Sequence, residues 1–219
     1  AYISMEKNEN YYDYENLGPD TIKFTLLDDN NAMLKGYNNG ELDFIENLPV
    51  DEIPTYLASG ELEIGDYLGT YYVCFNTEDE VFSDPNIRKA FSLVIDRNYI
   101  VENVSQAGEV PADGYVANGV NDAAGAGSDD FRTVGGSYYS ISDEDYEANC
   151  EEARQLLADA GYPNGEGFPT VEYLYNTADN HKKIGEALQN MWQTELGVTV
   201  NLNNQDWNVF LQNRKDGNF

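Results

Sequence analysis

Hydrophobic and polar positions in the first sixty residues follow a strand–helix–strand order. Residues 21–27 (TIKFTLL) are rich in β-branched and apolar types and predict a strand. Two aspartates then offer N-caps for a helix that runs to Asn39, with Gly40 in the position that commonly ends helices. Residues 42–45 predict a second strand, so the pattern indicates a βαβ unit with parallel pairing and a right-handed crossover. A short helix is expected over 50–59.

Two extended runs separated by a glycine follow this unit. Residues 61–66 and the apolar run 71–75 both predict strands, and Gly69 stands between them. A glycine at such a place lets a strand bend or pass from one sheet to another. The pattern therefore predicts two α/β lobes, the first over residues 1–68 and the second over residues 69–219.

Helical spacing dominates the first part of the expected second lobe. Asp84 and Pro85 form a helix start, because an aspartate caps free N–H groups and proline needs no partner at the first helical position. Asp96 starts a second helix in the same way. The stretch 107–140 holds many small and acidic residues with little periodicity, so we expect a long surface loop that is functional or mobile.

A second strand–helix–strand pattern occupies the C-terminal third and predicts another parallel βαβ unit. The chain stops at Phe219 without a closing element, and we expect both ends to continue in a longer protein. The predicted elements are a helix from Ser142 to Gly161, a strand over 171–176, a helix over 179–195, a strand over 198–202 and a helix over 206–214.

The charge balance narrows the classes of function. The chain has 12 Lys and Arg against 40 Asp and Glu, a formal net charge of −28, and 41% hydrophobic residues. The hydrophobic share supports a folded core and excludes an acidic disordered tail. Nucleic acids and anionic lipids are bound mainly through Lys and Arg, so most nucleic-acid functions are excluded. No apolar run reaches the roughly 18 residues that span a bilayer. No signal peptide is present either, so any export signal is expected to be removed or to lie outside this sequence.

The two cysteines do not form a CxxC pair. Cys74 and Cys150 are compatible with one disulfide or with two buried thiols, and the sequence leaves both open. Because Cys74 lies within the apolar run 71–75, we expect it to be a thiol in the core.

Catalytic and metal-binding patterns have no support in this sequence. With 40 acidic residues, some pair will always resemble a glycosidase or aspartic site, and a solvated acidic face explains them better. A nucleophilic triad has only His181 as a base and lacks a Gly-x-Ser-x-Gly turn. One histidine and two isolated cysteines cannot form a zinc centre, and glycine-rich phosphate loops are missing. We therefore expect no enzymatic activity, no metal and no cofactor.

Polar and aromatic residues near the C-terminus form a candidate binding site. Trp207 and Arg214 are seven residues apart, nearly two helical turns, so both can project from one side of a helix. In a chain with so few cations, an arginine beside a tryptophan suits a ligand that has a carboxylate and apolar groups. The pattern alone still favours a core tryptophan and a solvated arginine, and it favours a surface role for His181 at the start of the preceding helix.

Short motifs spread over almost the whole chain resemble one known family. They are YNNGELD (37–43), LGTYY (68–72), FNT (75–77), FSDPNIRKAF (82–91), IDR (95–97), ARQLLADAGY (153–162) and YNT (175–177). Each motif is weak by itself, but their order and spacing together resemble the extracellular solute-binding proteins, family 5, the oligopeptide- and dipeptide-binding components of ABC importers. NTADNHKK (176–183) and NQDW (204–207) are most similar to the oligopeptide-binding branch.

The resemblance implies a fold and a function. The fold would be α/β, a two-lobe arrangement of the periplasmic-binding-protein type II kind, of which this chain would hold an incomplete part. Two lobes would close over an extended oligopeptide and hold it through main-chain hydrogen bonds, which do not depend on peptide sequence. Tighter binding of the closed state would drive closure. The peptide would then pass to the permease subunits in the membrane.

Cleft positions of the family fall on five residues of this sequence. The resemblance places Tyr67 and Tyr72 near the crossing between the lobes and His181, Trp207 and Arg214 in the second lobe. It also implies a location outside the cytoplasmic membrane, either on a lipid attached to an N-terminal cysteine or free in a periplasm. Because other cleft elements would lie beyond Phe219, we expect this chain alone to bind ligand weakly or not at all.

Three alternatives stay open at the level of sequence. The same fold could bind another solute, such as a dipeptide, a nickel chelate or an opine. A carboxylate-dependent hydrolase would require one specific Asp or Glu for turnover. A surface sensor or adhesion module could keep the fold without transport.

Overall fold

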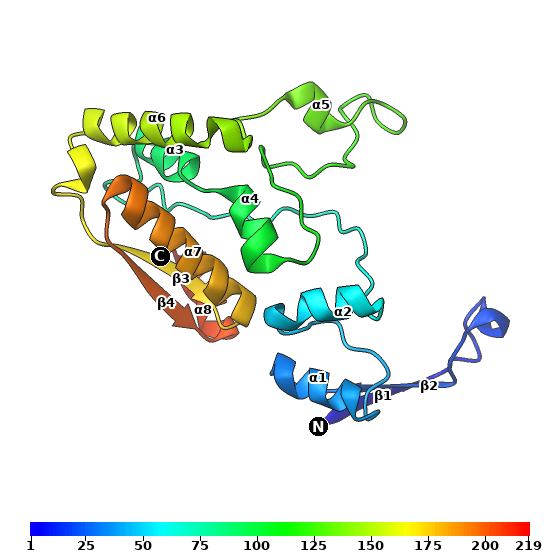
Figure 1. Cartoon of the computed structure of the whole chain (residues 1–219). Coiled ribbons are helices and arrows are strands. Elements are labelled where there is room, and N and C mark those ends of the chain that lie inside the picture. The colour runs from blue at the N-terminus through cyan, green and yellow to red at the C-terminus, as the bar shows by residue number, and fades with distance from the viewer. The chain divides into compact units, whose positions relative to one another are not determined.

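The computed structural model describes residues 1–219 as a mixture of helices and short strands (Figure 1). The chain divides into two compact units, residues 1–52 and residues 53–219, and each is described by itself. The expected lobe boundary between residues 68 and 69 stays a prediction. No helix combines the length and apolar character that crossing a bilayer requires.

The first unit is built on an antiparallel hairpin and one helix. In the hairpin, Tyr2 lies opposite Thr25 and Glu6 opposite Thr21. The side chain of Asp29 accepts a hydrogen bond from the Ala32 N–H and so caps the helix, as the sequence predicts. The elements are β1 (Tyr2–Glu6), η1 (Tyr14–Asn16), β2 (Thr21–Thr25), α1 (Asn30–Asn38) and η2 (Val50–Glu52).

The prediction of a βαβ unit in this region was wrong. Residues 42–45 form no strand, and β2 pairs with β1, which the sequence analysis did not predict. At the end of α1, Gly40 adopts a positive φ of 72°, and the Glu41 N–H bonds the Gly36 carbonyl at 2.8 Å. This is a Schellman ending, in which a following apolar residue folds back onto the helix. Leu42 fills that role and lies against Gly36, so it does not extend into a strand.

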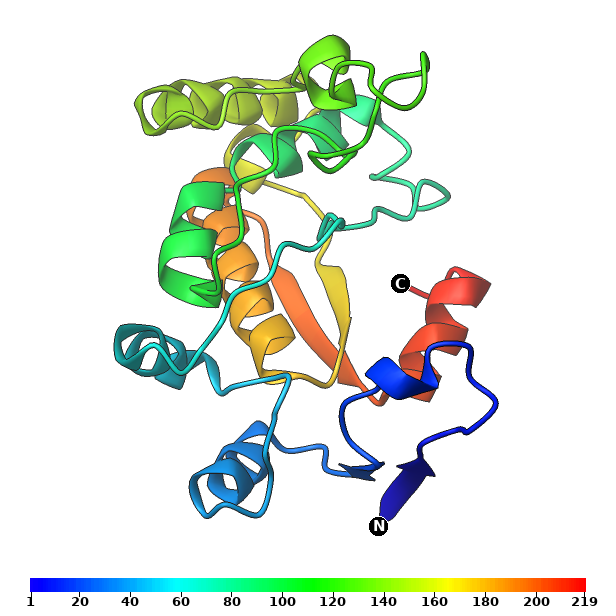
Figure 2. The ribbon, with the colours of Figure 1, turned by 90° about the vertical axis from the view of Figure 1, so that its right-hand side faces the viewer.

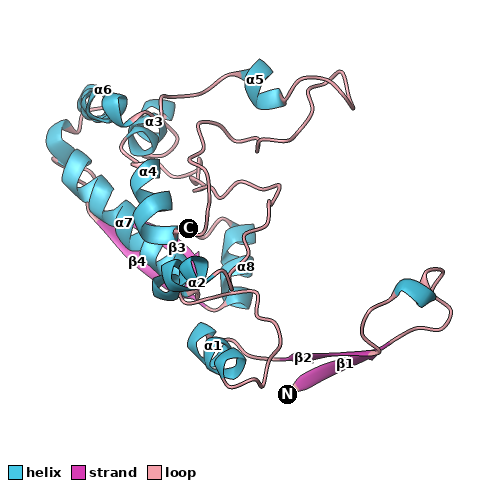
Figure 3. Cartoon of the chain, turned by 45° about the vertical axis from the view of Figure 1, so that its right-hand side comes forward, coloured by secondary structure: helices cyan, strands magenta, loops and turns pink.

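The second unit contains most of the helices and one pair of strands (Figure 3). Residues 61–66 and 71–75 were predicted as strands and are not, because neither run pairs with a neighbouring strand. The expected helix over 50–59 is confirmed by η2 and α2. The helices are α2 (Ile53–Ser59), α3 (Pro85–Leu93), α4 (Arg97–Tyr99), the π-helical turn η3 (Ile100–Ser105), α5 (Phe131–Gly135), η4 (Asp143–Asp145), α6 (Tyr146–Asp159), η5 (Pro163–Gly165), α7 (Asp179–Leu196) and α8 (Trp207–Asp216).

The C-terminal βαβ prediction is confirmed. Strands β3 (Val171–Asn176) and β4 (Val200–Gln205) pair in parallel, with Val171 opposite Val200. The connecting helix α7 covers one face of this pair, and α8 follows β4 directly (Figure 2). The predicted caps are confirmed as well, since Asp84 and Asp96 accept hydrogen bonds from N–H groups in the first turns of α3 and α4.

The core of the second unit forms where α3, α6 and α7 meet. Phe91 and Leu157 are almost completely buried, and Trp192 is 3% exposed. The Trp192 indole N–H donates a 2.8 Å hydrogen bond to the Phe91 carbonyl, which satisfies the one polar atom of a buried indole. Burial of this apolar surface is the main favourable term in folding, at roughly 25 cal/mol per Å².

The two cysteines are free thiols, and the expectation that Cys74 lies in the core was wrong. Cys74 is exposed, whereas Cys150 is fully buried. The segment around Cys74 is extended, so successive side chains point in opposite directions. Val73 and Phe75 pack against the core, and Cys74 therefore faces away from it.

We expect the stability of this chain to rise with ionic strength. No charged residue is buried, and 12 basic residues cannot neutralise 40 acidic ones, so the surface repels itself. Raising NaCl from about 0.01 M to about 1 M shortens the Debye length from roughly 30 Å to roughly 3 Å. The melting temperature followed by circular dichroism should increase by several degrees over this range at pH 7. Near the isoelectric pH of about 4.1 the increase should nearly vanish. An equal salt effect at both pH values would contradict this explanation.

Candidate functional site

Helix α8 presents an exposed aromatic and cationic face. Trp207 is 52% exposed and stacks on Phe210, with ring centroids 5.9 Å apart and planes 22° from parallel. The guanidinium carbon of Arg214 lies 5.8 Å from the centroid of the same Phe210 ring. Trp207 and Arg214 therefore share one side of the helix. Neither the indole nor the guanidinium is committed to the core, so both can contact a ligand.

Side-chain hydrogen bonds hold α8 at its start, middle and end. Asp206 caps the first turn by accepting from the Asn208 N–H. The Asn213 amide donates to the side-chain oxygen of Gln205 at 2.8 Å, which ties the helix to the end of β4. At the C-terminal end, Asn76 donates to the carbonyl of Gly217 at 3.0 Å.

Asn76 is the more distant of these partners in sequence and has two functions. Its amide N–H₂ group also donates to the Phe219 carbonyl at 3.2 Å, so it binds two carbonyls at the end of α8. Its side-chain oxygen accepts from the Glu78 N–H at 3.1 Å and stabilises the local turn. Sequence reasoning missed this role, although Asn76 lies in the FNT motif, because the contact spans 141 residues.

His181 lies in the first turn of α7 and contacts the extended segment 70–76. The hydroxyl of Tyr71 lies 2.9 Å from the imidazole Nδ1, and the two rings stack with centroids 5.5 Å apart. The imidazole is half-buried, and burial lowers the pKa of His181 below its ordinary value of 6.5. His181 is therefore neutral at pH 7. Tyr71 was not among the predicted site residues.

The two predicted tyrosines lie apart from the α8 face. Tyr67 is 91% exposed, and its ring lies beside Gly69. Tyr72 is 54% exposed and meets Tyr115 edge to face, with centroids 5.1 Å apart. The hydrogen bond between the two hydroxyls favours the neutral form of Tyr115 and raises the pKa of Tyr115. The structure thus joins neither Tyr67 nor Tyr72 to His181, Trp207 and Arg214 by any direct contact, and their roles in ligand binding stay predictions.

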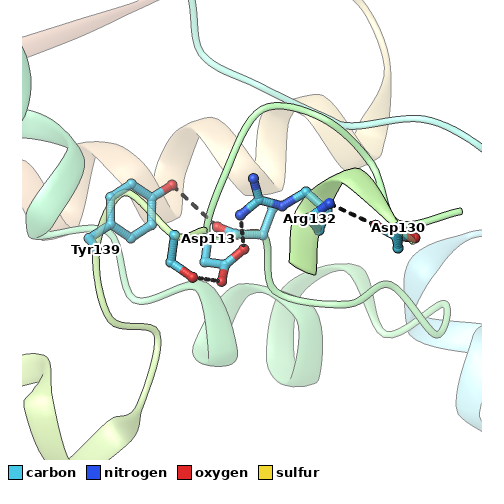
Figure 4. Close-up of polar contacts among 6 residues, drawn as sticks. Asp113, Asp130, Arg132 and Tyr139 are labelled. Carbon is cyan, nitrogen blue, oxygen red and sulfur yellow. Dashed lines mark hydrogen bonds and ion pairs between the residues drawn. The ribbon is translucent and has the colours of Figure 1, made fainter. Parts of the chain in front are cut away.

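The loop 107–140 is held by an ion pair that sequence reasoning missed (Figure 4). Arg132, whose side chain is 9% exposed, bonds Asp113 at 2.6 Å, and the Ser137 hydroxyl donates to the other carboxylate oxygen. The Ser137 hydrogen bond and the Arg132 guanidinium together lower the pKa of Asp113. Asp130 accepts from the backbone N–H of Arg132 and of Gly119, which folds the loop back on itself.

Replacing Asp113 with Asn should loosen this loop. The change keeps an acceptor for Ser137 but leaves the largely covered guanidinium of Arg132 without a counter-charge, which costs about 1–3 kcal/mol. The Tyr138 amide, bonded to the Asp113 carbonyl, should exchange with deuterium roughly tenfold faster, which corresponds to about 1.4 kcal/mol.

Low pH should have the same effect on the unmodified chain. Because the folded-state pKa of Asp113 is lowered, its stabilising contribution is present above the unfolded pKa and is lost as pH falls through the folded value. Protection of the Tyr138 amide, corrected for the intrinsic exchange rate, should therefore fall below pH 4 in the unmodified chain and stay flat in Asp113→Asn. The variant Asp129→Asn removes a carboxylate from the same loop and should leave exchange unchanged. Equal effects of the two variants would contradict the role of the ion pair.

Replacing Asn76 with Asp should fray the end of α8. Aspartate still accepts from the Glu78 N–H but cannot donate to the two carbonyls, and its charge opposes the helix dipole. Trypsin cleavage after Lys215 in the last turn should increase about tenfold, which corresponds to about 1.4 kcal/mol. The variant Asn218→Asp adds the same charge at this end without removing a donor. Equal cleavage rates in the two variants would show that charge alone is responsible.

Comparison with known proteins places these observations in a family. The model of the bacterial extracellular solute-binding proteins, family 5 Middle, matches residues 1–219. The chain is 33% identical to the oligopeptide-binding protein OppA of Bacillus subtilis, covering 95% of this chain and 37% of that protein. It is 34% identical to the dipeptide-binding protein DppE of the same organism, covering 97% of this chain and 37% of that protein.

Solved structures give the same result. The structure of the Escherichia coli murein tripeptide binding protein MppA has a TM-score of 0.81 at 30% identity and covers all of this chain and 41% of that one. Haemophilus influenzae OppA in complex with the peptide RPPGFSPFR has a TM-score of 0.82 at 27% identity, with the same coverage. These matches confirm the predicted α/β fold of the periplasmic-binding-protein type II kind, of which the chain spans about two fifths. This chain belongs to the bacterial extracellular solute-binding proteins, family 5.

Proposed function

We propose that the chain forms part of the substrate-binding component of an ABC importer, which binds extended oligopeptides and delivers them to a membrane permease. The observation that carries this proposal is the exposed face of α8, where Trp207 and Arg214 flank Phe210. The structural similarity to an OppA solved with a bound peptide supports the choice of ligand.

The chemistry of this face suits the C-terminal half of a peptide. The Arg214 guanidinium offers paired N–H donors to a carboxylate, a geometry that lysine cannot match. The Trp207 indole supplies a flat apolar surface for side chains of any kind. His181 adds a further polar group from α7, and Tyr67 and Tyr72 contribute aromatic contacts near the crossing. Main-chain hydrogen bonds supply affinity that does not depend on peptide sequence.

The proposal also covers the closure of the lobes, the location of the protein and its partners. The two lobes, residues 1–68 and 69–219, close over the peptide because the closed state binds it more tightly. The protein performs no chemical reaction and needs no cofactor. It works outside the cytoplasmic membrane, as the solute-binding proteins of its family do, held by an N-terminal lipid or free in a periplasm. Its partners are the peptide and the transmembrane subunits of the permease.

A different solute is the second candidate, because a dipeptide-binding protein is 34% identical to this chain. Mass spectrometry of the ligand that co-purifies separates the two. Peptides of three or more residues would support the oligopeptide proposal, and dipeptides alone or a non-peptide solute would overturn it.

Calorimetry with tri- to pentapeptides tests the proposal directly. The chain spans 37% of the length of the curated relatives described above, so by itself it should bind weakly or not at all. The chain extended by the coding sequence that flanks it should bind with micromolar affinity, which corresponds to about −8 kcal/mol. In that protein, Arg214→Gln should weaken binding of free-acid peptides about tenfold and leave C-terminally amidated peptides unaffected, since a charged hydrogen bond contributes roughly 1.5–3 kcal/mol.

Lys215→Gln is the matched control, because it removes a neighbouring cation from the same helical turn. Equal losses for the two variants would mean that net charge, and not contact with Arg214, attracts the peptide. Absence of binding by the extended protein for every peptide length would overturn the proposed function.

A further inference from the structure

Arg214 differs from the other four arginines of the chain in what its guanidinium contacts. Arg88 and Arg97 donate hydrogen bonds to backbone carbonyls. Arg132 and Arg154 form ion pairs with carboxylates at 2.6 and 2.7 Å. Arg214 alone is exposed, and its guanidinium contacts only an aromatic ring. A free arginine in a chain with 40 acidic residues requires an explanation in the surrounding structure.

The carbonyl groups at the C-terminal end of α8 are the natural acceptors for this guanidinium. The last four carbonyls of a helix have no partner within the helix. An arginine in the last turn can bond them, and the negative end of the helix dipole attracts it. Arg214 lies in that turn, so its guanidinium would turn toward bare carbonyls and be lost to a ligand.

Asn76 occupies these acceptors from outside the helix. Its amide donates to the Gly217 carbonyl at 3.0 Å and to the Phe219 carbonyl at 3.2 Å. The Asn213 carbonyl is occupied as well, because it accepts from the backbone N–H groups of Gly217 and Asn218. A carbonyl that is already hydrogen-bonded gains less from a second donor, so the attraction on the guanidinium falls.

The carboxylate in the last turn of α8 is also engaged by an amide. Asp216 accepts a hydrogen bond from the Gln212 side chain at 2.7 Å. These two residues are four apart and share a face of the helix, whereas Asp216 and Arg214 are two apart and do not. The guanidinium lies instead 5.8 Å from the ring centroid of Phe210, one turn back along the helix. Both kinds of competing acceptor are therefore engaged by neutral amides.

We propose that Asn76 is a positioning residue for solute binding, because it satisfies the end of α8 and so leaves the Arg214 guanidinium free for a ligand carboxylate. The ligand part of this inference rests on the proposed function, whereas the free guanidinium is a property of the ligand-free protein. Asn76 itself does not touch the solute. Its contribution to affinity therefore requires both Arg214 and a carboxylate on the ligand, which makes that contribution measurable.

Reaction with phenylglyoxal, which modifies free guanidinium groups, tests the inference without a peptide. Peptide mapping of the extended protein by mass spectrometry should show Arg214 as the fastest-reacting arginine within residues 1–219. In Asn76→Ala the guanidinium turns to the uncovered carbonyls, so the rate at Arg214 should fall about threefold or more. Asn76→Ser keeps one donor, as well as an acceptor for the local turn, and should give a smaller fall in the same direction.

Asn213→Ala is the matched control, because it removes an amide that ties α8 to β4 and leaves the hydrogen bonds of Asn76 in place. A merely structural role of Asn76 would loosen the helix end, and a looser end would expose Arg214 and speed its reaction. Slower reaction in Asn76→Ala without slowing in Asn213→Ala would support the inference. Unchanged or faster reaction in Asn76→Ala, or equal slowing in both variants, would overturn it.

Calorimetry of the extended protein with a tripeptide gives the second readout. Asn76→Ala should weaken binding of the free acid severalfold and leave the C-terminally amidated peptide unaffected. In the Arg214→Gln background the same change should have no further effect, because the guanidinium through which Asn76 acts is gone. Equal losses for the free acid and the amide would overturn the link to Arg214. If the unmodified extended protein binds no peptide, the proposed function fails, and the phenylglyoxal rates still decide whether Asn76 keeps the guanidinium free.

Discussion

The hydrogen bond from the Trp192 indole to the Phe91 carbonyl joins α7 to α3 in the core of the second unit. These residues are 101 positions apart, and both lie in the core where α3 and α7 meet. Trp192 also contacts the Tyr173 ring, so the same indole packs against a side chain of β3. Because cores are close-packed and low in dielectric, one satisfied polar contact of this kind specifies a single arrangement of its neighbours. The position of the candidate site follows from this core.

Because the surface is acidic, each cationic side chain of the candidate site has a large effect on the local electrostatic potential. In a chain with a net charge of −28, the field near the surface repels anions and attracts cations. A carboxylate can approach only where an arginine offsets that field locally. Arg214, whose guanidinium carbon lies 5.8 Å from the centroid of the Phe210 ring, offers such a place. An acidic surface disfavours contact with nucleic acid and anionic lipid, and it leaves very few cationic groups to which an anion can bind.

The fold could be predicted from the sequence where local signals decided it. The unit from β3 to β4 was predicted because β3 is rich in Val and Tyr, residues 198–200 are β-branched and Gly197 ends the helix between the strands. The second strand was expected over 198–202 and runs over Val200–Gln205. The strand predicted over 42–45 was wrong because Leu42 folds back on α1. An apolar residue that packs on a helix end cannot be told from an apolar strand residue by sequence pattern alone. The run 71–75 forms no strand because it has no neighbouring strand to pair with. The presence of such a neighbour cannot be deduced from the composition of the run itself.

The candidate site was predictable only in part for the same reason. Helical spacing alone placed Trp207 and Arg214 on one side of α8, because seven residues return to the same face. Tyr71, Asn76 and the pairing of Arg132 with Asp113 depend on contacts between distant residues. Motif matching included Tyr71 and Asn76 within LGTYY and FNT but could not say what each one touches. A propensity or a period describes neighbours along the chain, whereas these contacts are set by tertiary packing.

Segment 70–76 contacts one helix near each of its ends, so it connects α7 with α8. Near one end Tyr71 is tied to the first turn of α7, and at the other Asn76 is tied to the last turn of α8. A change in the backbone dihedral angles of Gly69 would therefore act on both helices together. Such coupling links the positions of the His181 imidazole and of the aromatic face of α8 through one short stretch of backbone.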